Sequence, residues 1–483
     1  MFPKYAGKNF IPAQQVHSSL CPKWAYFLLS NLPLAPSSGG IVISQYAQML
    51  AVGVDHEANM PSERSMGDQV TGFSQARSAQ AAALCMAFAC VAGPATAQQS
   101  DQTVFYQEGG LTLRWHLQAG AYAAAEQNLF WDLGSLSAPG FDANTEWMEF
   151  YIKPGLSFEY DLGASTELYG RLSFVSSYTL GTDAFDEGDT GDTTLEEAYL
   201  GLRGGAGGGL SYDISLGARE LRLGTGMLIA NGATSGFERG ALKFGPRRAW
   251  EMAAIAELSH EAFTGTAFYV DPNELPSTDG GNELAGFDLR FDDPRGGYLG
   301  ATYVRVLESD SPYVRARPGL APEILNGARD GTETVNIYAR TNPFEGGLSN
   351  WTFTTDLAYQ WNDRIDQEAW AGRVQAIYAM PDMAWSPTIT YGYQTFSGDD
   401  PSTTATIERY DPLYFEGSPS AWATGSKSAS TFINSNVAAH SLAVRLQPTA
   451  RDTLTFRYAH IRANELNSPI QFGQATRVDL SGN

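Results

Sequence analysis

The chain has 483 residues, of which 53 are Asp or Glu and 31 are Lys or Arg, so its formal net charge is −22 at pH 7. This acidic excess argues against nucleic acid as a partner. No apolar run of about 18 residues is present for a membrane-spanning helix, although strands that close into a barrel could still cross a bilayer.

The N-terminal part of the chain is predicted to be a leader. Residues 1–65 are rich in Ser, Pro and Ala, lack clear periodicity and precede a second start at Met66, so they are interpreted as an over-called start or a disordered leader. Residues 79–97 are apolar, follow an arginine and end in a small-x-small site, which is the layout of a secretory signal peptide. We therefore place a signal peptide at 66–97, with cleavage before Gln98. A buried helix and a lipid-anchored cysteine are the alternatives.

All cysteines of the chain precede this cleavage site, at Cys21, Cys85 and Cys90. The mature segment 98–483 would then contain none, and it would need no oxidative folding. Its stability would have to come from a closed network of backbone hydrogen bonds.

Alternation of apolar and polar residues with a period of two recurs along the mature segment. Successive side chains of a strand point to opposite faces, whereas a helix would spread these residues around its circumference. The segments of this kind are 149–160, 167–174, 197–203, 287–291, 335–340, 351–361 and 454–458. Their polar faces repeatedly carry ions, as expected for strands that separate lipid from a polar lumen.

The segment 351–361 shows the pattern most clearly. One face carries Trp351, Phe353, Leu357, Tyr359 and Trp361. A Trp ring prefers a position where one edge is dry and the other is wet. A tilted strand of this length rises about 25 Å, which is the height of the apolar band of an outer-membrane barrel.

Stretches rich in Gly, Pro, Asp, Ser and Asn separate the predicted strands. They are 132–146, 181–193, 203–209, 271–282, 307–332 and 397–435. The two longest, 307–332 and 397–435, are expected to lie outside the barrel or to fold over its mouth. Within 181–193, Asp186, Asp189 and Asp192 could gather a calcium ion, but a solvated acidic turn is favoured. The pattern predicts an all-β fold, a transmembrane antiparallel β-barrel of about 16–18 strands over 98–483.

Several motifs resemble the alginate-export family of outer-membrane barrels. They are A-Y-Q-W-N-D (358–363), W-S-P-T-I-T-Y-G-Y (385–393), F-S-G-D-D-P (396–401), R-Y-D-P-L-Y-F-E-G (409–417) and L-G-A-R-E-L-R-L-G (216–224). The resemblance implies an eighteen-stranded monomeric barrel in the cell outer membrane, with an Arg-rich lumen that passes an anionic polysaccharide outward. Two features depart from the family pattern. Residues 236–239 match the expected Arg-x-Phe-Asp-Gly strand poorly, and V-D-L-S-G-N (478–483) lacks the terminal aromatic residue of a closing strand, so one or two C-terminal strands are expected to be missing.

A pore for a polyanion needs fixed positive charge spread over many weak sites, and Arg supplies a planar, permanently charged donor group. By alternation, the predicted pore-lining residues are Arg171, Arg203, Arg290, Arg340, Arg373, Arg445, Arg457, Asp288 and Asp356. Arg219 and Arg222 have opposite parity, so both join this set only if a bulge falls at about 219–220. The alternative is that lumen arginines only pair with lumen carboxylates and hold the wall together.

We therefore expect a channel for an anionic polysaccharide or a related acidic solute. Outer-membrane lipid surrounds it in this interpretation, and periplasmic export machinery is a candidate partner. No cofactor, metal or enzymatic activity is expected, because the histidines lack metal-ligand spacing and the adjacent His440 and Ser441 would face opposite sides of a strand. The competing interpretation is a non-transporting surface barrel, either an adhesin or an outer-membrane esterase.

Overall fold

The computed structural model describes residues 103–127, 144–183, 187–205, 209–315, 317, 323–342, 349–400, 402–403, 405–415 and 434–465. The predicted leader 1–65, the predicted signal peptide 66–97 and the C-terminal V-D-L-S-G-N lie outside these ranges. Within the described ranges, no helix is long and apolar enough to cross a membrane.

The main sheet contains 16 antiparallel strands, and each pairs with its neighbour along the chain. They are β1 (Val104–Glu108), β2 (Leu111–Glu126), β3 (Thr145–Gly163), β4 (Thr166–Thr182), β5 (Gly188–Gly205), β6 (Ser211–Arg219), β7 (Trp250–His260), β8 (Phe263–Asp271), β9 (Glu283–Asp292), β10 (Tyr298–Glu308), β13 (Glu333–Thr341), β14 (Trp351–Asn362), β15 (Gln367–Ala379), β16 (Thr388–Phe396), β17 (Val437–Leu446) and β18 (Leu454–Ala463). A separate hairpin joins β11 (Tyr313–Arg315) to β12 (Glu323–Leu325), and η2 (Phe237–Arg239) is a short 3-10 helix. The predicted all-β antiparallel fold is confirmed.

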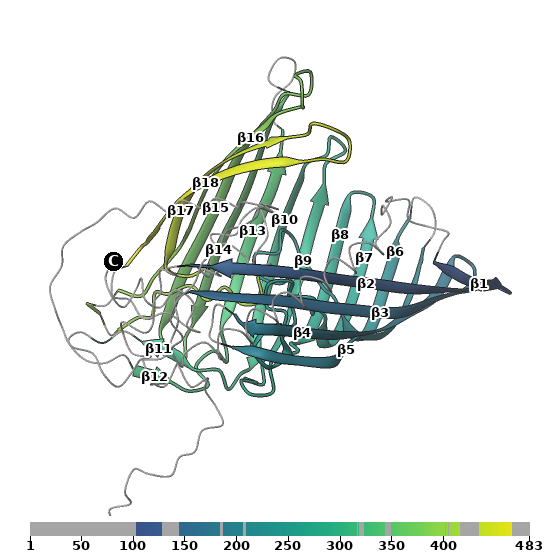
Figure 1. The fold of residues 1–483 in the computed structure, drawn as a ribbon, viewed down its shortest axis with the longest axis horizontal. Helices are drawn as coiled ribbons and strands as arrows, with labels where there is room; N and C mark the ends of the chain where they lie inside the picture. The colour runs from purple at the N-terminus through teal and green to yellow at the C-terminus, as the bar shows by residue number, and fades with distance from the viewer. Residues whose placement is uncertain are drawn as a thin grey trace, which may run out of the picture.

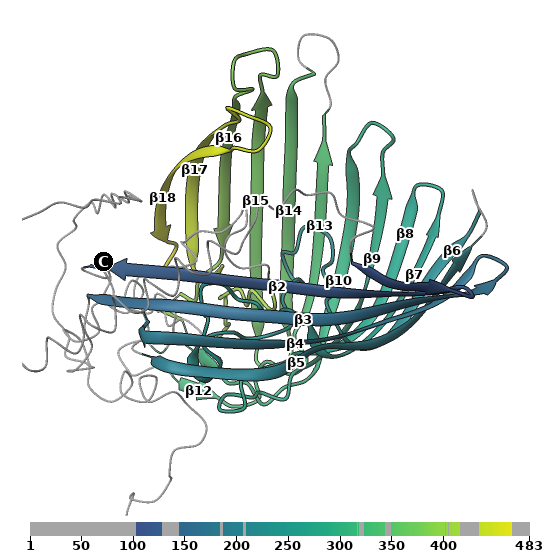
Figure 2. The same cartoon turned by 45° about the vertical axis from the view of Figure 1, so that its right-hand side comes forward.

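The sheet curves around an interior (Figure 1). In Figure 2, β2–β5 run across the view while β13–β18 run nearly vertically behind them, so two parts of one sheet face each other. The strand order begins at β1 and ends at β18, and no pairing between the described residues of these two strands closes the sheet.

The two ends of the wall differ in the length of their connections. At one end, called the loop end, the strands are joined by 127–144, 183–187, 220–249, 272–282, 309–332, 363–366 and 397–436. At the other, called the short-turn end, most connections are brief, such as 164–165 and 261–262. Outer-membrane barrels place short turns in the periplasm and longer loops outside, so the family resemblance predicts that the short-turn end faces the periplasm.

Two predicted boundaries are wrong. The expected turn 181–193 is largely strand, because β5 begins at Gly188 and the Asp183 N–H donates to the Glu187 carbonyl at 2.7 Å to close a tight hairpin. Asp189 and Asp192 therefore lie on a strand, while Asp186 is outside the described residues. The motif 216–224 is not one continuous strand either, since β6 ends at Arg219.

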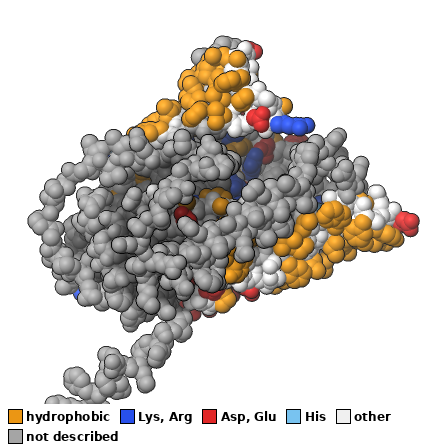
Figure 3. All heavy atoms as spheres, viewed as in Figure 1, with side chains coloured by type: hydrophobic (Ala, Val, Ile, Leu, Met, Phe, Trp, Pro, Cys, Tyr) orange, Lys and Arg blue, Asp and Glu red, His pale blue; other side chains and the backbone are white. Residues whose placement is uncertain are grey.

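The outer face of the wall is apolar. On β14, Leu357 is 55% exposed while the adjacent Asp356 is 0% exposed, so the predicted alternation of faces is confirmed there. Exposed large apolar side chains with the same outward orientation include Leu117, Leu156, Leu172, Leu200, Leu216, Leu289 and Phe456. Figure 3 shows apolar side chains gathered over β2–β5 and towards the tips of β15 and β16, with charged side chains in the hollow between them. An apolar surface of this extent requires lipid rather than water.

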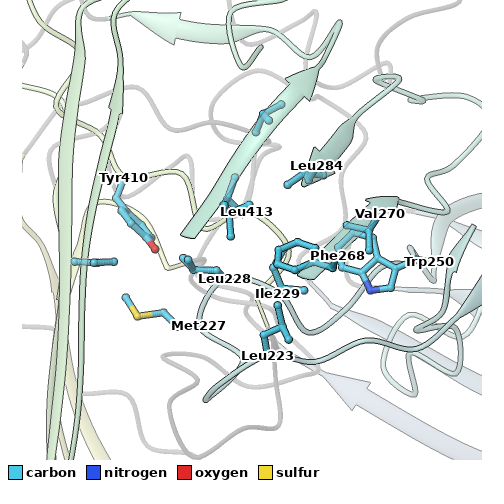
Figure 4. Packing of buried hydrophobic residues seen from close by; sticks show 14 of the residues in the cluster. Leu223, Met227, Leu228, Ile229, Trp250, Phe268, Val270, Leu284, Tyr410 and Leu413 are labelled. Atoms are coloured by element: carbon cyan, nitrogen blue, oxygen red, sulfur yellow. The ribbon is translucent and has the colours of Figure 1, made fainter. Parts of the chain in front are cut away.

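The interior at the loop end contains an apolar cluster built from wall and loops (Figure 4). Leu228 and Ile229 come from the β6–β7 connection and Leu413 from the β16–β17 connection, and they meet Phe268 and Val270 on β8. Buried apolar packing stabilises this arrangement at roughly 25 cal/mol for each Å² removed from water. These parts of the two connections therefore pack against the inner side of the wall, and for Leu413 this differs from the expected position outside the barrel or over its mouth.

The outward orientation of Leu357 can be tested by replacing it with Arg. An Arg near the middle of a lipid-facing strand should destabilise the folded protein by about 2–4 kcal/mol. Leu357→Met keeps the apolar surface and should leave stability nearly unchanged. Equilibrium unfolding in lipid vesicles measures both, and equal stability of the two variants would contradict the assignment of this face to lipid.

Candidate functional site

Ion pairs line the inner face of the β2–β6 wall. Arg203 Nη2 lies 3.0 Å from Glu159 and 2.6 Å from Glu167, and Arg114 also pairs with Glu159. On the same face, Arg171 Nε is 3.0 Å from Glu197 Oε2. Arg171 and Arg203 thus have carboxylate partners, which is the arrangement that the wall-stabilising alternative describes.

Lys153 on β3 sits among three carboxylates. Its Nζ lies 3.1 Å from Glu196 and Glu220 and 4.0 Å from Glu197. Two adjacent residues of β5 can both face inward because the register shifts there, with Ser173 opposite Glu197 and Phe174 opposite Leu195. Strict alternation did not predict that Glu196 faces inward. The two adjacent glutamates, Glu196 and Glu197, were the sequence signal that could have indicated a bulge here.

Arg219 and Arg222 both lie in the interior, but not for the expected reason. The register of β6 shifts between Gly217 and Arg219, and the chain then leaves the sheet. Arg219 Nη1 donates to the Tyr169 hydroxyl at 2.9 Å, and its guanidinium also lies over the Tyr199 ring. Arg222 lies beyond the strand and donates to the Thr225 carbonyl at 2.6 Å. Both arginines face the interior because β6 ends at Arg219, and not because of a bulge at 219–220.

Residues 220–249, called the crossing segment, run through the interior instead of outside it. Glu149, which is 0% exposed on β3, accepts from the backbone N–H of Lys243 at 2.9 and 3.0 Å and of Phe244 at 3.0 Å. Glu196 accepts from the backbone N–H groups of Arg248 at 2.9 Å and Ala249 at 3.3 Å. Two wall carboxylates therefore satisfy the backbone of this segment directly.

Arg247 adds a third anchor on the same side. Its Nη1 donates to Ser177 Oγ at 2.7 Å, its Nε to Thr194 Oγ1 at 2.7 Å and its Nη2 to the Asp192 carbonyl at 3.0 Å. Burial lowers the pKa of Arg247 to about 10, so the guanidinium remains protonated at neutral pH. A charged donor without a buried carboxylate partner is thereby held by neutral acceptors.

The opposite end of the crossing segment reaches β14 and β15. Thr225 Oγ1 donates to Asp356 at 2.7 Å and accepts from Arg373 Nη2 at 2.9 Å. Asp356 and Arg373 also pair with each other at 2.8 Å, and both side chains are 0% exposed. The crossing segment therefore spans the interior from β3–β5 to β14–β15, and it covers two of the predicted pore-lining residues.

Asp288 and Arg290 lie further along the inner face on β9. Asp288 accepts from Thr302 Oγ1 at 2.5 Å and from the Tyr338 hydroxyl at 2.9 Å, and it is buried. Arg290 pairs with Asp292 at 2.6 Å and stacks over the Tyr298 ring at 4.3 Å. These two predicted residues have partners within the wall.

Three predicted arginines differ from the others, and we call them the arginine face. Arg340, Arg445 and Arg457 are exposed, and none of them forms an ion pair with any residue in the described ranges. Arg340 lies on the same side of β13 as the buried Tyr338, Arg445 lies opposite Thr388, and Arg457 lies opposite Ala443. Strand alternation thus orients all three inward, near the short-turn end.

The residues around the arginine face are neutral and polar. Between the short turns and the Asp356–Arg373 pair, the inward positions of β14–β17 include Thr352, Thr354, Gln375, Thr388, Thr390 and Ser441. No carboxylate occupies an inward position of this region among the described residues. The fixed charge of this part of the inner wall is therefore positive and uncompensated.

The two long loops are bound to each other at the loop end. Arg329 Nε donates to Asp411 at 2.8 Å, and the Tyr313 hydroxyl donates to the same carboxylate at 2.7 Å. Burial and then Asp411 raise the pKa of Tyr313 far above its usual range. Although burial opposes the charged form, Asp411 raises the pKa of Arg329. The described parts of 307–332 and 397–435 consequently close together over this end.

The adjacent His440 and Ser441 do not form a catalytic pair. His440 lies on the outer face, where Nδ1 is 2.9 Å from the Tyr391 hydroxyl. Ser441 lies on the inner face, opposite Gly392. Within the part of the chain that the structure describes, no group of three or more His, Cys, Asp or Glu could hold a metal ion.

Residues 324–483 match the family model described as alginate export, which confirms the resemblance predicted from sequence. No curated protein matches the chain. Among solved structures, OprB of Pseudomonas putida at high pH is similar at a TM-score of 0.40 and 10% identity, covering 72% of this chain and 89% of that one. In-vitro folded OmpT of Vibrio cholerae is similar at 0.37 and 10% identity, covering 74% and 88%. The Rhodopseudomonas blastica porin triple mutant scores 0.36 at 10% identity, covering 72% and 94%.

The anchoring of the crossing segment can be tested at Glu149. Glu149→Ala removes the acceptor for two buried backbone N–H groups, each of which then costs about 1–3 kcal/mol, so the segment should detach. Single-channel conductance should rise and proteolysis within 220–249 should accelerate. Glu159→Ala is the matched control, because Glu159 lies on the same face of β3 but pairs only with wall arginines. Unchanged conductance in Glu149→Ala would contradict this role.

Proposed function

For this outer-membrane barrel, whose residues 324–483 match the alginate-export family, we propose a channel that passes an anionic polysaccharide or a related acidic solute. The observation that carries the proposal is the arginine face, with three inward cations and no carboxylate beside them in the described residues. Four other predicted arginines pair with carboxylates and stabilise the wall, so they add little net positive charge to the lumen. They are Arg171, Arg203, Arg219 and Arg290.

The chemistry of this face suits an acidic sugar chain. Arginine pairs with carboxylate oxygens through a planar fork, whereas Thr, Ser and Gln side chains both donate to and accept from hydroxyl groups. A channel must bind its cargo strongly enough to admit it and weakly enough to release it. Exposed arginines without a carboxylate partner supply such weak sites, while a buried pair such as Asp356–Arg373 cannot exchange its partner readily.

The position of the arginine face supports outward passage. It lies towards the short-turn end, where a cargo that arrives from the periplasm would enter. The crossing segment narrows the interior beyond it, at the level of Thr225 and Asp356. An extended chain fits this arrangement better than a folded macromolecule does. Periplasmic export machinery would then contact the short turns.

The test removes charge from the arginine face. A triple variant combines Arg340→Ala, Arg445→Ala and Arg457→Ala. Its channel selectivity should move towards cations, because the remaining carboxylates then set the potential of the lumen. Reversal potentials across a planar bilayer under a salt gradient measure this shift. It should be large at 0.1 M salt and small at 1 M, since the Debye length falls from about 10 Å to about 3 Å.

Arg462→Ala is the matched control, because Arg462 lies on β18 like Arg457 but has the opposite orientation. It should leave the reversal potential unchanged. The same reversal potential in wild type and triple variant would contradict the proposal, provided that heat-modifiable electrophoretic mobility shows that both are folded. A folded protein that never conducts would instead favour the adhesin or esterase interpretation.

A further inference from the structure

The outer face of β17 and β18 carries basic residues, whereas the other outward positions of these two strands are apolar or aromatic. His440 and His460 lie directly opposite each other in the β17–β18 pair, and Arg462 follows on the same face, opposite Ala438. All three are exposed. The next outward rows on the same strands are apolar or aromatic, with Leu442 opposite Tyr458. We call His440, His460 and Arg462 the outer basic patch.

Neighbouring aromatic residues hold the first histidine in place. The Tyr391 hydroxyl lies 2.9 Å from His440 Nδ1, and the Tyr393 ring is 4.7 Å from the His440 ring, centroid to centroid. Because Nδ1 is occupied, Nε2 is the ring nitrogen left for a further partner. Tyrosines with one apolar and one polar edge are typical of the boundary between membrane and water.

No acidic residue of the described chain neutralises this patch. Arg462 forms no ion pair with the described residues. Glu465, the next carboxylate along the chain, interacts electrostatically with Asp400 and Glu408 rather than with Arg462. The outward-facing Arg305 shows the contrast, since its Nη1 lies 3.6 Å from Glu333. The described chain therefore supplies no counter-charge for the outer basic patch.

The position of the patch indicates what that partner is. His440 and His460 lie near the loop-end limits of β17 and β18, which begin at Val437 and end at Ala463. The loop end of an outer-membrane barrel faces the outside, so the patch lies towards the outer leaflet. A cation on a lipid-facing strand is costly near the bilayer centre and much less so near the interface, where headgroup oxygens are available.

We propose that the outer basic patch binds the phosphate of an outer-leaflet lipid headgroup. Arg462 pairs with two phosphate oxygens through its planar fork, and the histidine ring nitrogens donate to the remaining ones. The acyl chains then lie against the apolar rows below, which include Leu442, Tyr458 and Phe456. This proposal depends on the outer-membrane location of the chain but not on what the lumen conducts.

Native mass spectrometry of the purified full chain, with lipid added in detergent, tests the proposal. The probes are a diphosphorylated lipid A and the same glycolipid without phosphates. The wild-type protein should retain the phosphorylated form at least tenfold more than the other. In the triple variant His440→Gln, His460→Gln and Arg462→Gln, the preference for the phosphorylated glycolipid should fall at least tenfold. Arg451→Gln is the matched control, because Arg451 is exposed on the turn at the opposite end of the same two strands.

Each outcome decides the question. If the triple variant does not fold, the single change Arg462→Gln serves in its place and should lower the preference at least threefold. Equal retention of both glycolipids by the wild type overturns the proposal. So does full displacement of the bound lipid by inorganic phosphate at millimolar concentration, because the site would then serve free anions. The proposal is also overturned if the wild type is an oligomer, the triple variant is a monomer and both retain the same amount of lipid. The patch would then be a contact between copies of the chain.

Discussion

Two buried carboxylates on the inner wall, Glu149 and Glu196, hold the crossing segment by accepting hydrogen bonds from its backbone. Buried N–H groups without acceptors are costly, so a segment with little regular structure can lie inside a wall only if the wall supplies them. Arg247 reinforces this attachment, and Thr225 completes it on the opposite side. The apolar cluster at the loop end and the burial of Asp356 and Arg373 both follow from the segment being held in this position.

The inner face consequently has two characters. On β2–β6 its cations are paired with carboxylates of the wall, as Arg203 and Lys153 show. On β13–β18, near the short-turn end, Arg340, Arg445 and Arg457 form no ion pair with a carboxylate of the described residues. The number of arginines on the inner face therefore does not predict the electrostatic potential of the lumen, because the charge of a paired arginine is largely cancelled by its carboxylate. The outer face shows the same distinction, since Arg305 pairs with Glu333 whereas Arg462 forms no ion pair with a described residue.

Much of the wall could be predicted from the sequence. On β14, alternation assigned Asp356 to the inner face and Leu357 to the outer one, because a strand offers only two directions. The prediction failed where the period breaks. Both Glu196 and Glu197 face inward at a bulge, and the strand expected over 216–224 ends at Arg219. The turn expected over 181–193 became strand because a tight hairpin needs few residues.

The sequence by itself determined the all-β fold, the apolar outer face, the orientation of most strand residues and the family resemblance. Each of these depends on local periodicity or on contiguous motifs. Only the tertiary structure decided that 220–249 crosses the interior, that Asp356 and Arg373 are buried, and that no described carboxylate pairs with the arginine face. Glycines at positive φ within that segment, such as Gly236 and Gly240, marked an irregular path but not its destination. Pairing and burial depend on residues far apart in the chain, as with Glu149 and Lys243, and no local pattern encodes which of them meet.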